Sequence, residues 1–352
     1  MVHVLHILLT LAVSALAGLL LQRLKVPAGM MIGALAAAAA LTGTFHLGEM
    51  PEAAKTVSQL IAGVLIGCST GREDLRQLKT LYKPVLTVIG ALLLGNLVMG
   101  ALLCAAGYSD LLTCLVCAIP GGIADVTLIA VDLGANPSKV LLVHFCRLVA
   151  GVALFPLLIP HLAPPVEQET APSLRGEPPA PPRPAPHNGP RLLVYFVLGW
   201  AASLLGNALH VPAATILFSL ISSLALNLCG FSVSLPNALR RLAQVLSGAY
   251  IGCLLDPDLF GGPLTILSAV GITVVVLLAN AYVFGRWMRR FLGIPLREGM
   301  LMLTPAGASD MALISADIGV VSPRLVLVQI FRLLAAIALF PQICLAVWRL
   351  VG

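Results

Sequence analysis

The segment PGGIAD at residues 120–125 returns as PAGASD at residues 305–310, and this pair of segments decides how the fold is predicted. The same offset of 185 residues relates further segments: DLG at 132–134 and DIG at 317–319, RL at 147–148 and 332–333, LFP at 154–156 and 339–341, and LxVPA at 24–28 and 209–213. One unit of about 155 residues is therefore present twice, and a fold prediction has to account for such an internal repeat first.

The composition is that of a polytopic membrane protein. Of the 352 residues, 59% are hydrophobic and only 10% are charged, whereas a soluble domain carries about 25% charged residues. The apolar runs, such as 85–106 and 265–284, are continuous and long enough for spanning helices of about 20 residues. A membrane barrel needs alternating apolar and polar residues, and these runs do not alternate. The sequence therefore predicts an all-α protein embedded in the lipid bilayer.

Each copy of the repeat contains six apolar elements, followed in the first copy by a polar segment. We expect the elements near 4–22, 28–44, 54–69, 84–106, 110–133 and 139–161, and near 191–207, 213–229, 239–254, 264–285, 297–318 and 324–348. Residues 163–190 contain ten prolines, a composition typical of an extended, disordered linker. The chain thus divides into a membrane repeat at 1–162, a proline-rich linker at 163–190 and a second membrane repeat at 191–352.

The loop charges predict opposite orientations for the two repeats. Basic residues gather after the first and third elements of the first repeat, but before the third and after the fourth element of the second. Cytoplasmic loops carry the excess of Lys and Arg, so we expect inverted repeats and a cytoplasmic linker. Inversion requires an odd number of crossings per repeat. We therefore predict ten full transmembrane helices and two elements, 110–133 and 297–318, that are either broken helices or re-entrant hairpins.

The two interrupted elements carry the candidate site. Proline lacks a backbone donor and glycine allows unusual dihedral angles, so a half-helix should begin after each break and direct its free N–H groups into a cavity. Asp125 and Asp310 would fall in the first turn of these half-helices, where they either cap the helix or bind a substrate or coupling ion. The break residues expected to line the site with them are Gly121, Gly122, Ala306, Gly307 and Ser309.

Polar residues of the neighbouring elements complete the predicted site. Arg147 and Arg332 lie deep in apolar helices, so each needs a carboxylate or carbonyl partner; we expect Asp–Arg contact, as a neutralising pair or around a bound anion. His144 and Gln329 precede the arginines by three residues and either join helices by hydrogen bonds or, for His144, titrate near neutral pH. Two further candidates, expected at the membrane interface near a cavity mouth, are Asp132 and Asp317.

The duplicated P-[GA]-G-x-x-D segment, followed by D-[LI]-G and by a helix with R-L and L-F-P, resembles the AbrB family of bacterial inner-membrane proteins. The resemblance covers the chain except the linker and is most specific in the second half of each repeat. It implies a multi-pass inner-membrane protein with a fold similar to that of the sodium/proton antiporter and bile-acid symporter superfamily. Members are labelled as regulators of gene expression or as ammonia monooxygenases. A soluble DNA-binding regulator shares the name, but this sequence does not resemble it.

Inverted repeats with broken helices are typical of secondary transporters. We therefore expect transport of a small polar or anionic metabolite coupled to H⁺ or Na⁺, without another cofactor. The alternative is a membrane regulator that acts indirectly on gene expression, because no segment outside the membrane could form a DNA-reading module. An ammonia monooxygenase needs clustered copper or iron ligands, and the seven histidines are dispersed. We expect neither a metal site nor an enzyme activity. The sequence does not decide between a monomer and a homodimer.

Overall fold

The computed structural model describes residues 2–24, 26, 28–162, 189–231, 233, 235–255, 262–304 and 323–351. Every regular element within these ranges is an α-helix, in agreement with the all-α prediction. Among the described residues, four helices are long and apolar enough to cross a membrane, and the bent pair α14 (Pro323–Ala338) and α15 (Phe340–Val351) counts as a fifth. The four are α1 (Val2–Arg23), α4 (Arg72–Ala105), α8 (Gly189–Ala208) and α11 (Pro263–Leu292).

Helix α4 differs most from the expected boundaries. It begins at Arg72, whereas the apolar run begins only near residue 84, and it contains Pro84 in its interior. Residues 72–83 are rich in Arg, Glu, Gln, Lys and Leu. These residues have high helix propensity, so the helix continues into the charged segment where hydropathy alone predicts a loop.

The described helices belong to two compact units, and both units take helices from both repeats. Unit 1 comprises residues 1–71, 123–141 and 186–261, and unit 2 comprises residues 72–122, 142–185 and 262–352. The first three elements of each repeat therefore fold together, and the fourth elements of both repeats belong to the other unit.

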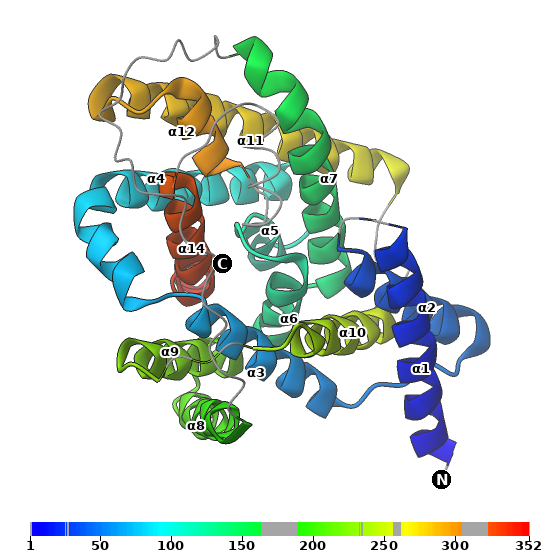
Figure 1. Ribbon diagram of the computed structural model, residues 1–352. Helices are drawn as coiled ribbons and strands as arrows, with labels where there is room; N and C mark the ends of the chain where they lie inside the picture. The colour runs from blue at the N-terminus through cyan, green and yellow to red at the C-terminus, as the bar shows by residue number, and fades with distance from the viewer. Residues whose placement is uncertain are drawn as a thin grey trace. The chain divides into compact units, whose positions relative to one another are not determined.

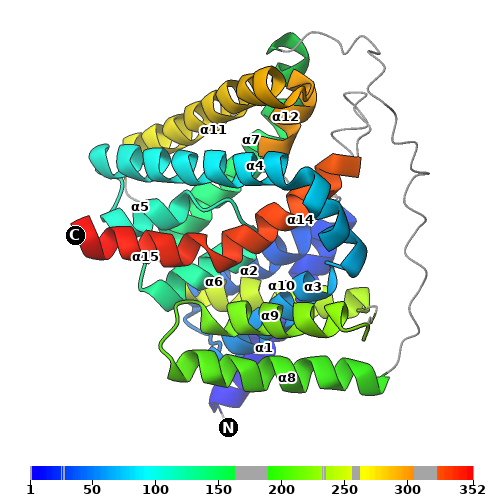
Figure 2. The same ribbon diagram turned by 90° about the vertical axis from the view of Figure 1, so that its left-hand side faces the viewer.

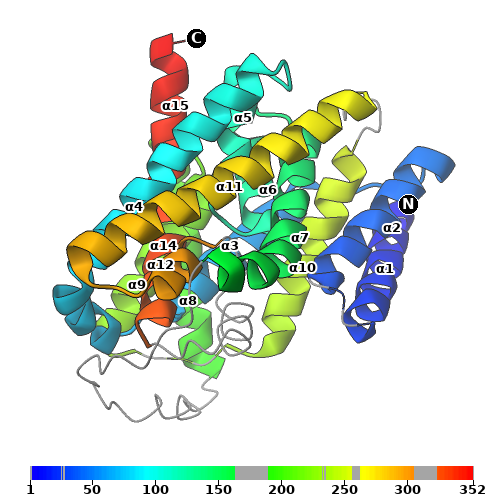
Figure 3. The same cartoon turned by 90° about the horizontal axis from the view of Figure 1, so that it is seen from above.

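Six of the described helices of unit 1 contact one another in the order α1, α2 (Gly29–Phe45), α10 (Asn237–Leu254), α3 (Glu52–Cys68), α9 (Ala214–Leu228) and α8. Figure 3 shows α1 beside α2, and Figure 2 shows α8 beside α9. Helix α6 (Ile123–Leu133) packs on α3 and α10 at the middle of this order. Its Leu128 joins a buried apolar cluster with Met31 and Tyr250.

Glycines allow the close helix contacts of unit 1, as expected for small-x-x-x-small spacing. A Cβ on Gly63 of α3 would lie 2.6 Å from the carbonyl oxygen of Ile216 on α9, and a Cβ on Gly248 of α10 would lie 2.6 Å from that of Met31 on α2. These two contacts are related by the offset of 185 residues. The central pair, α3 and α10, is joined by Ser58, whose hydroxyl donates to the Ala243 carbonyl at 2.9 Å.

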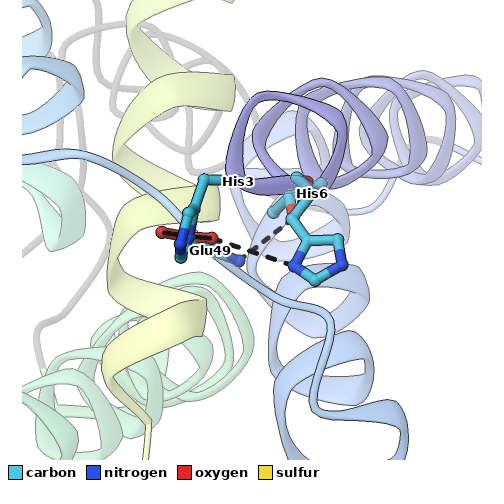
Figure 4. A network of polar contacts seen from close by, with 4 residues as sticks. His3, His6 and Glu49 are labelled. Carbon is cyan, nitrogen blue, oxygen red and sulfur yellow. Dashed lines mark hydrogen bonds and ion pairs between the residues drawn. The ribbon is translucent and has the colours of Figure 1, made fainter. Parts of the chain in front are cut away.

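The loop after α2 is tied to α1 by a polar cluster (Figure 4). The Glu49 carboxylate oxygens both lie 3.0 Å from Nδ1 of His3, and one lies 3.8 Å from Nδ1 of His6. The backbone N–H of Glu49 also donates to the Thr10 hydroxyl at 3.2 Å. The His3 side chain is 82% exposed, so solvent screening keeps the contribution of this pair to stability small.

Unit 2 is built around α4 and α11, which lie side by side (Figure 1). Helix α5 (Leu111–Cys117) packs on α4, and α12 (Leu296–Leu303) packs on α11. Helix α14 also contacts α4, and α7 (Pro137–Leu162) carries most of its length in this unit. At the crossing of α4 and α11, the Asn280 amide donates to the Ala91 carbonyl at 2.9 Å.

Candidate functional site

The fifth element of the first repeat is interrupted, as the Pro-Gly segment predicts. Helix α5 begins after Asp110, whose carboxylate accepts a hydrogen bond from the Thr113 N–H at 3.0 Å, and ends at Cys117. Pro120 cannot donate a helical hydrogen bond and disfavours helical dihedrals in the residue before it. The chain therefore leaves the helix through Gly121 and Gly122 and starts α6 at Ile123. The backbone carbonyls at the end of α5 are left without helical donors.

Arg147 supplies those missing donors. Its side chain is buried, at 4% exposure, and its guanidinium donates to the carbonyls of Ile119 at 2.5 Å and Gly121 at 2.6 Å. Its Nη2 also lies 3.0 Å from Nδ1 of His144. Arginine can only donate, so Nδ1 of His144 is the acceptor and the ring is neutral. The aspartate that we expected as the partner of Arg147 is replaced, among the described residues, by backbone carbonyls, because a helix end presents negative potential to a cation.

Arg332 makes the corresponding contact in the second repeat. It is 8% exposed, and its guanidinium donates to the Thr304 carbonyl at 2.6 Å. Thr304 precedes Pro305 as Ile119 precedes Pro120, so the two arginines bind equivalent carbonyls. Gln329, the counterpart of His144, donates from its amide to the Leu301 carbonyl at 3.4 Å. Sequence reasoning could not identify these partners, because every residue carries a carbonyl group.

The two arginines and the break line one small cavity in unit 2. Its wall includes Pro120, Arg147 and Arg332, together with Asn96 of α4 and Asn280 of α11. The volume of about 20 Å³ is room for about one water molecule. Each asparagine donates to a backbone carbonyl at 2.9 Å, Asn96 to Leu115 and Asn280 to Ala91. Oδ1 of Asn280 is buried without a partner among the described residues. The asparagines were not among the predicted site residues.

Asp125 lies in the first turn of α6, as predicted, and its side chain is half-buried. If the carboxylate capped the half-helix, it would accept a hydrogen bond from a nearby backbone N–H. No hydrogen bond or ion pair joins it to another residue that the structure describes. The described part of the chain therefore gives no support to the capping alternative, and the carboxylate is available to bind a substrate or a coupling ion. Asp125 belongs to unit 1 and the cavity to unit 2.

Asp132, at the other end of α6, is held by two residues of α3. One carboxylate oxygen lies 2.9 Å from the Lys55 ammonium, and the other accepts from the Gln59 amide at 2.6 Å. Both charged side chains are 18% exposed. Lys55 and Gln59 are spaced i, i+4, which places them on one helix face. This spacing can be recognised in the sequence, but it does not show which helix the face contacts.

The remaining predicted site residues are in the second break. Ala306, Gly307, Ser309, Asp310 and Asp317 lie outside the residues that the structure describes.

Comparison with known proteins places this architecture in a family. The family model described as "Transition state regulatory protein AbrB" matches residues 1–163 and again residues 152–347. "Uncharacterized protein YhjN" of Bacillus subtilis (strain 168) is 26% identical over 349 residues, which cover 94% of this chain and 90% of that protein. "Putative regulator AbrB" of Escherichia coli (strain K12) is 30% identical over 132 residues, 36% of each chain.

Proposed function

This chain belongs to the AbrB family, and we propose that it is a secondary transporter of a small polar or anionic metabolite coupled to H⁺ or Na⁺. One observation carries the proposal: the interrupted element α5–α6 leaves its helix end at a cavity whose wall contains two buried arginines. Buried charge in an apolar helical protein is costly and is retained for function more often than for stability. The proposal includes no enzymatic step.

Asp125 is the proposed site of the coupling cation or proton. A carboxylate at membrane depth without a described partner can bind Na⁺ or accept a proton at little competing cost. Asp310 occupies the same position in the second repeat and is proposed to share this role. Gly121, Gly122 and their counterparts Ala306 and Gly307 would allow the backbone to approach the bound ion.

The proposed topology is ten full crossings in two inverted repeats of a bacterial inner-membrane protein. It is supported by the loop charges and by contacts that recur at the same offset, such as those of Gly63 and Gly248. The hydrogen bond from Ser58 to Ala243, its own equivalent position, is the contact expected beside a two-fold axis. Single cysteines placed at residues 70–83 and at 254–263 should be labelled from opposite sides of the membrane. Labelling of both from one side would refute inversion.

The cavity is too small for a metabolite in the described conformation, so transport requires the helices around it to move. Helix breaks and small residues let one group of helices move against another in transporters with broken helices. We therefore assign the described conformation to an occluded state, and we expect solute entry only after a change of conformation.

Proteoliposomes containing the purified protein test the transport proposal. Solute uptake should depend on a proton or sodium gradient and should be abolished in Asp125→Asn and Asp310→Asn. Glu49→Gln, at an exposed carboxylate, is the matched control and should transport as the unchanged protein does. Coupled uptake that persists in both aspartate variants would remove these carboxylates from the mechanism. Absence of gradient-driven uptake across a panel of small organic acids, amino acids and inorganic anions would refute transport.

A membrane regulator is the second candidate function. The printed names of the family and of the E. coli relative favour it. Such a protein would act through a partner bound to the linker at 163–190, because that segment is the longest one between the apolar elements. Deleting 163–190 should then abolish the change in gene expression, while Asp125→Asn leaves it intact. The opposite pattern would favour the transporter.

A further inference from the structure

We infer that the last two turns of α11 bind the phosphate headgroup of an anionic phospholipid. The binding surface is a basic-aromatic patch, which consists of Arg286, Trp287, Arg289, Arg290 and Phe291. This inference requires that α11 crosses the membrane, but it does not depend on transport. It applies to a transporter and to a membrane regulator alike.

The patch begins where the apolar part of α11 ends. Residues 264–285 carry no charge, and at 1.5 Å per residue this part of the helix extends over about 33 Å. The hydrocarbon core of a bilayer is about 30 Å thick. When α11 crosses the membrane, the patch therefore lies at the level of the lipid headgroups.

The patch occupies an exposed face of α11. All five of its side chains are exposed, Trp287 to 41% and Phe291 to 62%, whereas Met288 between them is completely buried. Trp287 and Phe291 are spaced i, i+4, and their ring centroids are 5.0 Å apart. Arg286 and Arg290 have the same spacing and lie beside this pair on the helix surface. One face of α11 thus presents two guanidinium groups next to an aromatic pair.

The three arginines of the patch are available to an external anion. None of them makes a hydrogen bond or an ion pair with another residue that the structure describes. The helix dipole favours cations within the last turn of a helix, which accounts for Arg289 and Arg290 but not for Arg286, one turn earlier. A guanidinium binds phosphate through two parallel N–H groups, and the spacing of Arg286 and Arg290 allows both to reach one phosphate.

The start of α4 adds positive charge at the same end of unit 2. Figures 1, 2 and 3 show α4 and α11 side by side and antiparallel, so the start of α4 lies at the same end as the last turns of α11. Residues 72–83 and 286–298 together contain eight basic and three acidic residues. The opposite ends of the two helices, 98–110 and 262–278, contain one acidic and no basic residue. The excess of five positive charges attracts an anionic membrane surface.

The aromatic pair favours a lipid over a soluble anion. Tryptophan gathers at the interface between hydrocarbon and headgroups, where its ring contacts acyl chains and its N–H contacts polar groups. Inorganic phosphate would gain nothing from two exposed rings, and a basic loop that only orients the protein in the membrane does not need them beside its arginines. A phosphate attached to acyl chains matches both halves of the patch, and this is the chemistry of an anionic phospholipid.

Fluorescence quenching by brominated lipids tests the inference in the full-length protein. Trp200→Phe and Trp348→Phe, both at exposed positions, leave Trp287 as the only tryptophan of the chain. This variant is reconstituted in phosphatidylcholine vesicles that contain either phosphatidylglycerol or phosphatidylcholine with brominated acyl chains. Titration of the brominated lipid should show that phosphatidylglycerol binds beside Trp287 at least fivefold more tightly than phosphatidylcholine. Equal quenching by the two lipids would overturn the inference.

Two double variants of this single-tryptophan protein locate the site. Arg286→Gln with Arg290→Gln should reduce the preference for phosphatidylglycerol at least threefold. Arg240→Gln with Arg241→Gln is the matched control, because it removes the same charge from two exposed arginines of α10, and it should leave the preference unchanged. An equal effect of the two double variants, whether a loss or none, would show that the patch does not select the lipid and would overturn the inference. If the first variant does not fold, the comparison of the two lipids still decides the question.

Soluble competitors distinguish the lipid from other anions. At constant ionic strength, neither inorganic phosphate nor a DNA oligonucleotide should reduce the quenching by brominated phosphatidylglycerol, since neither supplies acyl chains. Displacement by inorganic phosphate would identify a site for soluble phosphate, and displacement by the oligonucleotide would identify a nucleic-acid surface. Either result would overturn the inference, and neither would change the interpretation of the uptake assays with the aspartate variants.

Discussion

Replacing Arg147 by methionine should destabilise the protein by about 2 kcal/mol, because three hydrogen bonds end on this one side chain. They join it to the carbonyls of Ile119 and Gly121 and to Nδ1 of His144. Hydrogen bonds between membrane helices average about 0.6 kcal/mol each and reach about 1.7 kcal/mol. Three of them give about 2 kcal/mol, with an upper value near 5 kcal/mol. Methionine retains the apolar volume of the stem but leaves all three acceptors without a donor.

Equilibrium unfolding in mixed micelles, followed by circular dichroism, measures this loss. Arg23→Met is the control, and it should change the unfolding free energy by less than about 0.5 kcal/mol as expected for an exposed site. Arg147→Lys should give an intermediate loss, since one ammonium group keeps the charge but lacks the planar fork that reaches two carbonyls. If the unfolding free energy of Arg147→Met lies within about 0.5 kcal/mol of that of the unchanged protein, the guanidinium does not stabilise the end of α5.

Three further experiments test other parts of the structure. Gly63→Ala should cost about 1 to 3 kcal/mol by overpacking, whereas Gly90→Ala, in open space on α4, should stabilise by up to about 1 kcal/mol in the same micelle assay. A double-mutant cycle between Lys55→Met and Asp132→Asn should give a coupling free energy of about 1 to 2 kcal/mol, a value between those of surface and buried ion pairs. A coupling free energy of zero would show that this ion pair does not stabilise the protein. Asp110→Ala should cost about 1 kcal/mol at pH 7. Burial raises the pKa of this carboxyl, but hydrogen bonds at the start of α5 outweigh burial and lower the pKa. The loss of unfolding free energy in Asp110→Ala should therefore shrink below about pH 4, where the carboxylate becomes protonated. A loss that does not depend on pH would contradict the role of Asp110 as the N-cap of α5.

The positions of most helices could be predicted from the sequence, because the length of an apolar run and the residues that interrupt it are local properties. The run near 28–44 became α2 at Gly29–Phe45, and the predicted break became the gap between α5 and α6. The start of α4 could not be predicted from hydropathy, because charged residues with high helix propensity extend the helix beyond its apolar part.

The sequence indicated the first break and the two arginines, which line the cavity, because charge and proline are conspicuous in an apolar sequence. It did not indicate Asn96 and Asn280 of the same wall, and a binding role of these residues stays a prediction. The contacts depend on which helices meet, and that is a tertiary property. Lys55 could not be assigned to Asp132 from spacing alone, and the carbonyl partners of Arg147 carry no side-chain signal at all.

His144 and Gln329 show why the two repeats can differ at an equivalent position and still keep the same framework. A neutral histidine has one N–H donor and one acceptor nitrogen, and glutamine has an NH₂ donor group and a carbonyl acceptor, so both side chains can donate and accept. His144 accepts from Arg147 and lies against the backbone of Val116 and Cys117, while Gln329 donates to Leu301, the counterpart of Val116. A protonated His144 would lose the acceptor and place a second positive charge 3.0 Å from Arg147. The position therefore selects a neutral side chain that joins the end of a half-helix to the arginine helix, and the geometry argues against a role for His144 as the coupling proton site.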